Sequence, residues 1–101
     1  MATFLFAYRV PHDYALGRPD AASAWNDWFA SMGGGLQDIG KPVAQAAALG
    51  DAAAGTRLGG YSLVTAADLD AALALAKGCP ALALGGAVEV GALAEVPGRP
   101  A

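Results

Sequence analysis

The sequence predicts one small domain of the α+β class, with its elements in the order β-α-β-β-α-β. Three patterns lead to this prediction: an alternating segment at residues 3–10, helical apolar stripes at 25–32 and 69–76, and a second alternating segment at 87–93. A chain of 101 residues can bury one core of modest size.

The first strand is expected at residues 3–10, where successive side chains alternate between two faces. One face carries the bulky residues Phe4, Phe6, Tyr8 and Val10. The other face is partly apolar as well, with Thr3, Leu5, Ala7 and Arg9. Pro11 is expected to end the strand, because proline cannot donate to a sheet, and residues 11–19 are expected to form a loop.

The first helix is expected to start at an N-cap formed by Asp20 or Ser23 and to end near Met32. Its stripe at i, i+3, i+4 and i+7 consists of Trp25, Trp28, Phe29 and Met32. The glycines at 33–35 stop the helix.

A short strand is expected at 36–39, followed by a turn at 40–42. Residues 43–57 are rich in Ala, Gly, Gln and Asp and show no clear period. They are expected to form either a loop or a partly helical segment.

The second helix is expected from Thr65 to Lys77, after a strand at 60–64. Thr65 and Asp68 fit a variant of the capping box. Lys77 suits the negative end of the helix, Gly78 suits a left-handed cap, and Pro80 prevents continuation. The stripe expected to face the core consists of Leu69, Ala72, Leu73 and Ala76.

The last strand is expected at 87–93, and residues 97–101 form a frayed tail after a domain that spans 1–96. In this strand Val88, Val90 and Ala92 alternate with Ala87, Glu89, Gly91 and Leu93.

This order of elements is that of the ferredoxin-like split βαβ fold. Its right-handed crossovers place both helices on one face of a four-stranded antiparallel sheet. The other face then stays bare, although Leu5, Ala7 and Leu93 make it partly apolar. We therefore expect a homodimer through the open sheet face.

Composition excludes several functional classes. The net charge is −3 and the six basic residues are scattered, which argues against a nucleic-acid partner. One cysteine and one histidine allow neither an internal disulfide nor a Cys/His metal site, and no cofactor is expected. No signal peptide and no apolar run of membrane-spanning length is present, so a cytoplasmic protein without a membrane partner is expected.

Two loops contain the candidate acid/base residues. His12 is a potential general base, and the neighbouring Asp13 could polarise it, although a solvated loop pair is the alternative. Asp38 and Lys41 flank Gly40, where a carboxylate at a strand end could bind substrate. The alternative role for Asp38 is an Asx-type cap of the turn.

Arg9 and Glu89 share the bare face and are expected to form a cross-strand ion pair, whereas the functional alternative is an anion contact by Arg9. Trp25 and Trp28 are expected in the core rather than stacked on a ligand. Tyr61 could lend its hydroxyl to a pocket or fill the layer between helix and sheet. Cys79 follows a helix C-terminus, whose negative potential would raise its pKa, so a structural role is expected.

Several runs, in this order, resemble the YCII-related family, which includes the DGPF-domain proteins. The resemblance spans residues 4–93 and consists of WNDWF at 25–29, DIGKP at 38–42, GGYSLV at 59–64, ADLDAA at 67–72, KGCP at 77–80 and GGAVEV at 85–90. It implies the dimeric α+β barrel fold. Some members carry a His–Asp pair, but the matching helix here has Trp25, Asn26 and Trp28, so no such pair is transferred.

The function expected from these observations is a small-molecule binding or accessory module that works as a homodimer. The alternative is an enzyme that uses His12 or Asp38 as acid/base on a small polar or aromatic substrate. The cleft is expected between the bare sheet and residues 41–58. The expected ligand-binding residues are Arg9, His12, Asp38, Lys41, Tyr61 and Glu89.

Overall fold

A computed structural model describes residues 1–15, 19–52 and 54–99. The strands are β1 (Ala2–Pro11), β2 (Leu36–Asp38), β3 (Thr56–Ala66) and β4 (Ala87–Ala92). The helices are α1 (Pro19–Met32), the 3-10 turn η1 (Gly33–Gly35), α2 (Leu69–Ala76) and α3 (Pro80–Ala83). The α+β class is therefore confirmed, and the described residues contain a short third helix, α3, that the expected order lacks.

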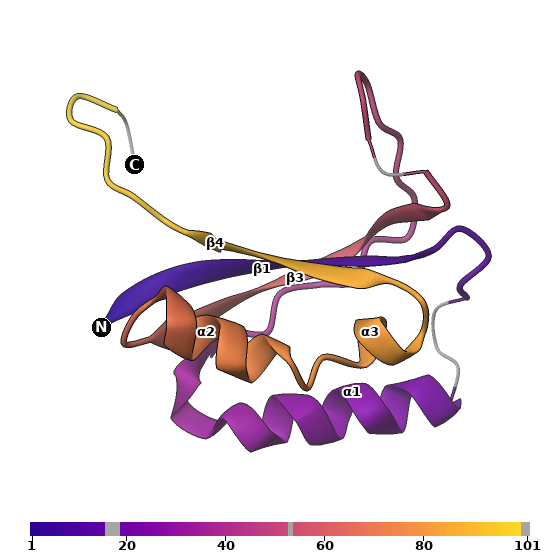
Figure 1. The fold of residues 1–101 in the computed structure, drawn as a ribbon, viewed down its shortest axis with the longest axis horizontal. Coiled ribbons are helices and arrows are strands. Elements are labelled where there is room, and N and C mark those ends of the chain that lie inside the picture. Colours follow the sequence, from indigo (N-terminus) through magenta and orange to yellow (C-terminus); the bar gives the residue numbers. More distant parts are fainter. Residues whose placement is uncertain (16–18, 53, 100–101) are drawn as a thin grey trace.

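The strands form one antiparallel sheet in the order β2-β3-β1-β4. The long central pair is β1 with β3, in which Phe4 lies opposite Val64 and Phe6 opposite Ser62. Figure 1 shows α1, α2 and α3 on one face of this sheet and no helix on the other. The arrangement is compatible with a ferredoxin-like fold.

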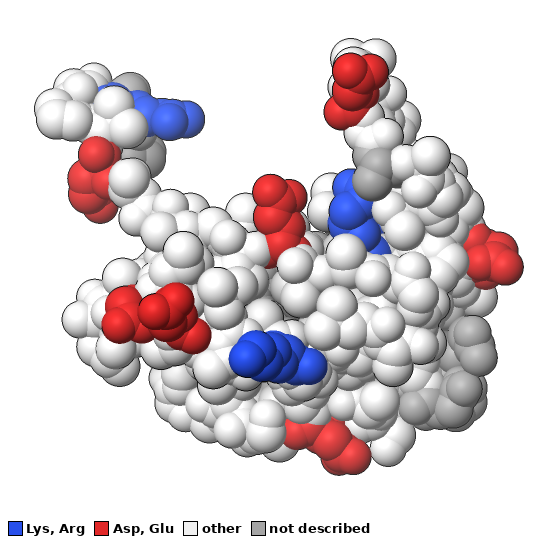
Figure 2. Space-filling model, viewed as in Figure 1, with Lys and Arg blue, Asp and Glu red and all other residues white. Residues whose placement is uncertain are grey.

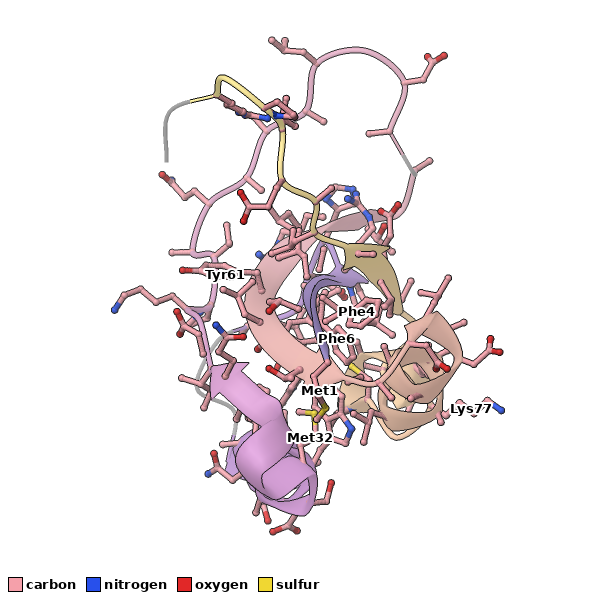
Figure 3. The ribbon with its side chains drawn as sticks, turned by 90° about the vertical axis from the view of Figure 1, so that its left-hand side faces the viewer. Met1, Phe4, Phe6, Met32, Tyr61 and Lys77 are labelled. Carbon is pink, nitrogen blue, oxygen red and sulfur yellow. The ribbon has the colours of Figure 1, made fainter. Side chains whose placement is uncertain are left out.

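The core lies between the sheet and the helices, as the alternation in the first strand predicts. Phe4, Phe6, Tyr8 and Val10 are all at most 4% exposed. From α1, Trp28 and Met32 reach the same core, whereas Trp25 and Phe29 are only half-buried against it. Figure 3 shows Phe4 and Phe6 near the middle of the molecule, above Met32.

Trp28 also ties α1 to the end of α2. Its indole Nε1 donates to the carbonyl of Leu75 at 3.0 Å. A Cβ at Gly78 would lie 3.1 Å from Cδ1 of the same indole, so a larger residue would push Trp28 away. Gly78 is not among the residues with positive φ. The prediction of a left-handed cap at Gly78 was wrong, and the glycine serves close packing instead.

The second helix begins later than the capping-box pattern suggests. Thr65 still belongs to β3, where it pairs with Thr3. Asp68 is itself the N-cap, because its carboxylate accepts from the amide of Ala71 at 2.8 Å. The capping-box prediction was therefore wrong about Thr65, because the strand continues to Ala66.

The core-facing side of α2 is narrower than predicted. Ala72 and Ala76 are buried, but Leu69 and Leu73 are 47% and 43% exposed. Leu75 packs against the core instead. The large rings of β1 fill the layer beneath α2, so the helix turns its small alanines toward the sheet and the two leucines outward.

Three further differences concern ends and connections. Pro80 does stop α2, but it also starts the one-turn helix α3, because proline suits a first helical position. Helix α1 starts at Pro19, so neither Asp20 nor Ser23 precedes it as an N-cap. Residues 43–55 contain no helix in the described part, and Thr56 already belongs to β3. The part of the predicted first loop at 16–18 and the tail end at 100–101 lie outside the described residues.

The open sheet face carries side chains from three strands and is largely apolar. Leu5, Ala7 and Leu63 are half-buried there, while Leu58 and Tyr61 are 40% and 39% exposed. Two irregular segments, on either side of residue 53 and after β4, project from this side of the sheet (Figure 1). Within the described residues, no helix is long and apolar enough to cross a membrane.

Candidate functional site

A cavity of about 270 Å³ lies between α1, the end of β1 and the β2–β3 connection. Its wall is mainly aromatic, with rings from Tyr8, Tyr14, Trp25, Phe29 and Tyr61. Aliphatic residues and three glycines complete the wall: Val10, Ala22, Ile39, Pro42, Gly40, Gly59 and Gly60, with Lys41 beside them. We call this cavity the aromatic pocket.

The helical stripe of α1 builds one side of the aromatic pocket. Trp25 packs edge-on against Tyr8, with ring centroids 4.8 Å apart and planes at 68°. Phe29 stands one turn along and lies 5.8 Å from Trp25. Aromatic pairs in these geometries fix one another's orientation. Trp25 and Phe29 are half-buried because one surface of each ring joins the core while another faces the pocket.

Glycines build the opposite side by allowing two backbone segments to touch. Gly40 has φ of +71° and no room for a Cβ, because the carbonyl of Tyr61 lies against it. A Cβ at Gly60 would lie 3.0 Å from the carbonyl of Lys41. Val43 donates from its amide to the carbonyl of Gly59 at 3.0 Å. The segment after β2 therefore runs flat along β3 and leaves space on its helix side.

Tyr8 lines the aromatic pocket, but its hydroxyl group is buried and presents almost no surface to it. The residue is 4% exposed, and among the described residues its hydroxyl has no hydrogen-bond partner. Burial raises the pKa of Tyr8 above its usual range. Ser62 donates to the carbonyl of Ile39 at 2.7 Å. The phenol is therefore neutral at physiological pH, in surroundings that disfavour charge.

Of the residues predicted for the site, Lys41 and Tyr61 line the aromatic pocket. His12 is exposed in the turn that the amide of Tyr14 closes onto the carbonyl of Pro11 at 3.0 Å. Asp38 accepts from the amide of Gly40 at 2.8 Å, which is the Asx-type cap that we considered as the alternative. Neither His12 nor Asp38 is part of the pocket wall.

Arg9 and Glu89 lie on the open face rather than in the aromatic pocket. Arg9 donates from Nε to the Thr56 hydroxyl at 2.9 Å and from Nη2 to the Thr56 carbonyl at 3.0 Å. Glu89 is exposed. The predicted ion pair between the two is not formed among the described residues, because Thr56 lies on the other side of Arg9 and accepts from its Nε and Nη2.

Sequence reasoning missed most of the pocket wall, including Tyr14, Phe29 and Gly59. The expected cleft lay between the bare sheet and residues 41–58, whereas the cavity opens on the helix side of that segment. A signal was available in the three glycines at 40, 59 and 60, since adjacent glycines permit two backbones to approach closely.

Cys79 is buried at the junction of α2 and α3, beside a second, shallower cavity of about 410 Å³. Burial raises the pKa of its thiol to about 11, and the amides of Ala81 and Leu82 offset part of this. The direction is the predicted one, but burial rather than the helix end is the main cause. Within the described residues, no group of three metal-ligating side chains comes together.

Comparisons with protein-family models, with curated proteins and with solved structures give no match to this chain.

Proposed function

We propose that this protein is a binding module for a small, largely apolar ring compound, and that it works as a homodimer. The aromatic pocket carries the first part of the proposal. A dry cavity of about 150 Å³ can hold benzene, so 270 Å³ suits one substituted ring. The wall supplies aromatic and aliphatic surfaces, with Lys41 beside them. Such a combination is typical of ligand sites.

Binding is favoured over acid/base catalysis because the candidate catalytic groups are elsewhere. A general base must come within hydrogen-bond reach of the proton that it removes. His12 is exposed in a turn, and the Asp38 carboxylate is engaged by Gly40. The titratable side chains in the pocket wall are three tyrosines and Lys41, and Lys41 is exposed.

The open sheet face supports the homodimer. No helix of the described residues covers it, and Leu58, Tyr61 and Leu93 expose 40%, 39% and 53% of their surfaces on this side. Two such sheets packed face to face would form the dimeric α+β barrel that the YCII-like motifs imply. Tyr61 belongs both to this face and to the pocket wall, so the partner would also cover one edge of the pocket.

A blocking variant tests the binding site. Ala22 lines the pocket from α1, whereas Ala30 is equally an exposed alanine of α1 but does not line it. We expect substituted single-ring compounds to quench or shift the tryptophan fluorescence and to raise the melting temperature. Near 100 times its dissociation constant, a ligand adds roughly 2.7 kcal/mol of stability. Ala22→Phe should abolish both effects, and Ala30→Phe should retain them.

The proposal would be overturned if no single-ring compound stabilises the wild-type protein, or if Ala22→Phe binds as the wild type does. Circular dichroism of both variants should match that of the wild type, because both positions are on the exposed side of the helix.

A further inference from the structure

On the open face, one positive and one negative side chain lie close together on adjacent strands. On the open-face positions of β1, β3 and β4, the charged residues are Arg9 and Glu89. The cross-strand register places Glu89 opposite Ala7 and Arg9 opposite Ala87. The two charges are therefore diagonal neighbours on adjacent strands, with Cα atoms roughly 7–8 Å apart.

Neither charge is neutralised within the described part of the chain. Arg9 donates hydrogen bonds from Nε and Nη2 to Thr56, and its Nη1 has no hydrogen-bond partner among the described residues. Glu89 is exposed and makes no hydrogen bond or ion pair with them. Arg57 points elsewhere, because it donates to the carbonyls of Tyr14 and Val43. The Asp38 carboxylate on the edge strand accepts from the amide of Gly40. Asp51, Glu95 and Arg99 lie on the irregular segments outside the strands. A partner on this face would meet a guanidinium edge and a carboxylate side by side, neither of them paired with another charge of the described residues.

We propose that each copy in the homodimer pairs its Arg9 with Glu89 of the other copy, so that these two residues set the register of the two sheets. The inference rests on the homodimer proposed above. In a two-fold interface, contacts occur twice: if residue i touches residue j of the partner, j touches i. A neighbouring plus and minus charge is therefore self-complementary, and one dyad yields two ion pairs.

Other registers would leave these charges badly placed. A two-fold axis through Arg9 would bring two arginines together, and one through Glu89 two carboxylates, which repel. A register that sets either charge against Leu63 or Leu5 would bury it without a partner, and that is costly. Burial of the apolar side chains favours association of the two faces but does not specify how the two sheets are oriented. The charged pair does specify that orientation.

The shape of the open side also favours a second copy of this chain as the partner. Figure 2 shows the molecule hollowed above the sheet, between the projecting segment around residue 53 and the segment after β4. Each arm carries an exposed apolar residue that a second copy could cover, with Leu49 100% and Val96 51% exposed. The charges at 9 and 89 lie on the sheet between the roots of these arms.

Charge exchange tests the proposed register. The dimer dissociation constant would be measured by sedimentation equilibrium for the wild type, Glu89→Arg, Arg9→Glu and the double variant. Each single reversal brings two like charges together twice, so we expect the constant to rise at least about tenfold. The double variant restores opposite charges in exchanged positions and should return most of the affinity.

Lys77→Glu is the matched control for Arg9→Glu, because Lys77 is exposed on the helix side, away from Tyr61 (Figure 3). It should leave the dissociation constant unchanged. If Arg9→Glu fails to fold because Thr56 loses its donors, the series Glu89→Gln and Glu89→Arg remains, with progressively weaker dimers expected.

The outcomes separate the two proposals. A wild-type protein that stays monomeric at hundreds of micromolar would overturn the homodimer itself. A wild-type dimer that Glu89→Arg leaves unaltered, or a double variant no better than the single ones, would overturn the register while leaving the dimer intact.

Discussion

At the scale of single residues, the core contains two buried groups that can ionise, the Tyr8 hydroxyl and the Cys79 thiol. The Tyr8 hydroxyl is enclosed without a partner among the described residues, and the Cys79 thiol is 3% exposed. Both groups have their pKa raised, with burial as the largest cause. An ionised form of either would be an unpaired buried charge, so the fold holds both groups neutral.

These shifts predict a loss of stability in alkaline solution. In the unfolded chain the Cys79 thiol ionises near its usual pKa of 9.0, but in the folded chain its pKa is about 11. The unfolded state loses the proton first, so the free energy of unfolding falls as pH rises from about 9 to about 11. Tyr8 acts in the same direction from about pH 10 upward, since its usual pKa is 10.0 and burial raises the pKa of the folded form.

Urea unfolding of the wild type and Cys79→Ala at several pH values checks this prediction. The variant is expected to be less stable near neutral pH because of the smaller side chain. Its stability should then fall less steeply above pH 9, by up to about 2 kcal/mol over the interval. Parallel curves for the two proteins would contradict the assignment.

At the scale of elements, the start of α2 depends on one side chain. The helix has eight residues, too few to be stable without its cap and its packing. Asp68 satisfies the amide of Ala71, while its neighbour Asp70 lies in the first turn of the helix, and both are exposed. The two carboxylates thus have the same charge and lie close together in the chain, but it is Asp68 that accepts the hydrogen bond from the amide of Ala71.

Asp68→Ala is expected to lower the free energy of unfolding by about 1 kcal/mol, since the amide of Ala71 loses its acceptor. Asp68→Asn should retain most of the stability, because asparagine also accepts at an N-cap. Asp70→Ala is the matched control and should cost at most about 0.5 kcal/mol, through the helix dipole alone. Equal losses for Asp68→Ala and Asp70→Ala would show that charge, not capping, is what matters.

At the scale of the whole molecule, the helices of the described residues all lie on one side of the sheet and none of them on the other (Figure 1). Apolar side chains are exposed on both sides, but only the open face presents them on a flat surface between two arms. Leu58 on that face and Leu73 on α2 are similarly exposed, at 40% and 43%. They allow the same substitution to be compared on the two sides of the molecule.

Leu58→Glu is expected to shift the protein from a dimer toward the 10.0 kDa monomer in light scattering, because it places a charge in the proposed interface. Leu73→Glu should leave the dimer mass unchanged, since α2 faces outward. The proposed interface would be ruled out if Leu73→Glu dissociated the dimer and Leu58→Glu did not.

The sequence by itself determined the features that depend on local periodicity. Alternation in the first strand assigned Phe4, Phe6 and Tyr8 to the buried face, and the spacing of Trp28 and Met32 assigned the face of α1, because side-chain direction follows directly from strand and helix geometry. The same alternation predicted that the other face of the first strand, with Leu5 and Ala7, is partly apolar.

Only the tertiary structure decided which distant groups meet. Leu69 and Leu73 of α2 face outward because the rings of β1 already fill the space below the helix. The Arg9 side chain donates to Thr56 instead of pairing with Glu89. Position 78 requires glycine because Trp28 of α1 packs against it. The aromatic pocket likewise exists only where α1 passes the segment after β2. Contacts of this kind depend on volumes and partners far apart in the chain, which no local pattern encodes.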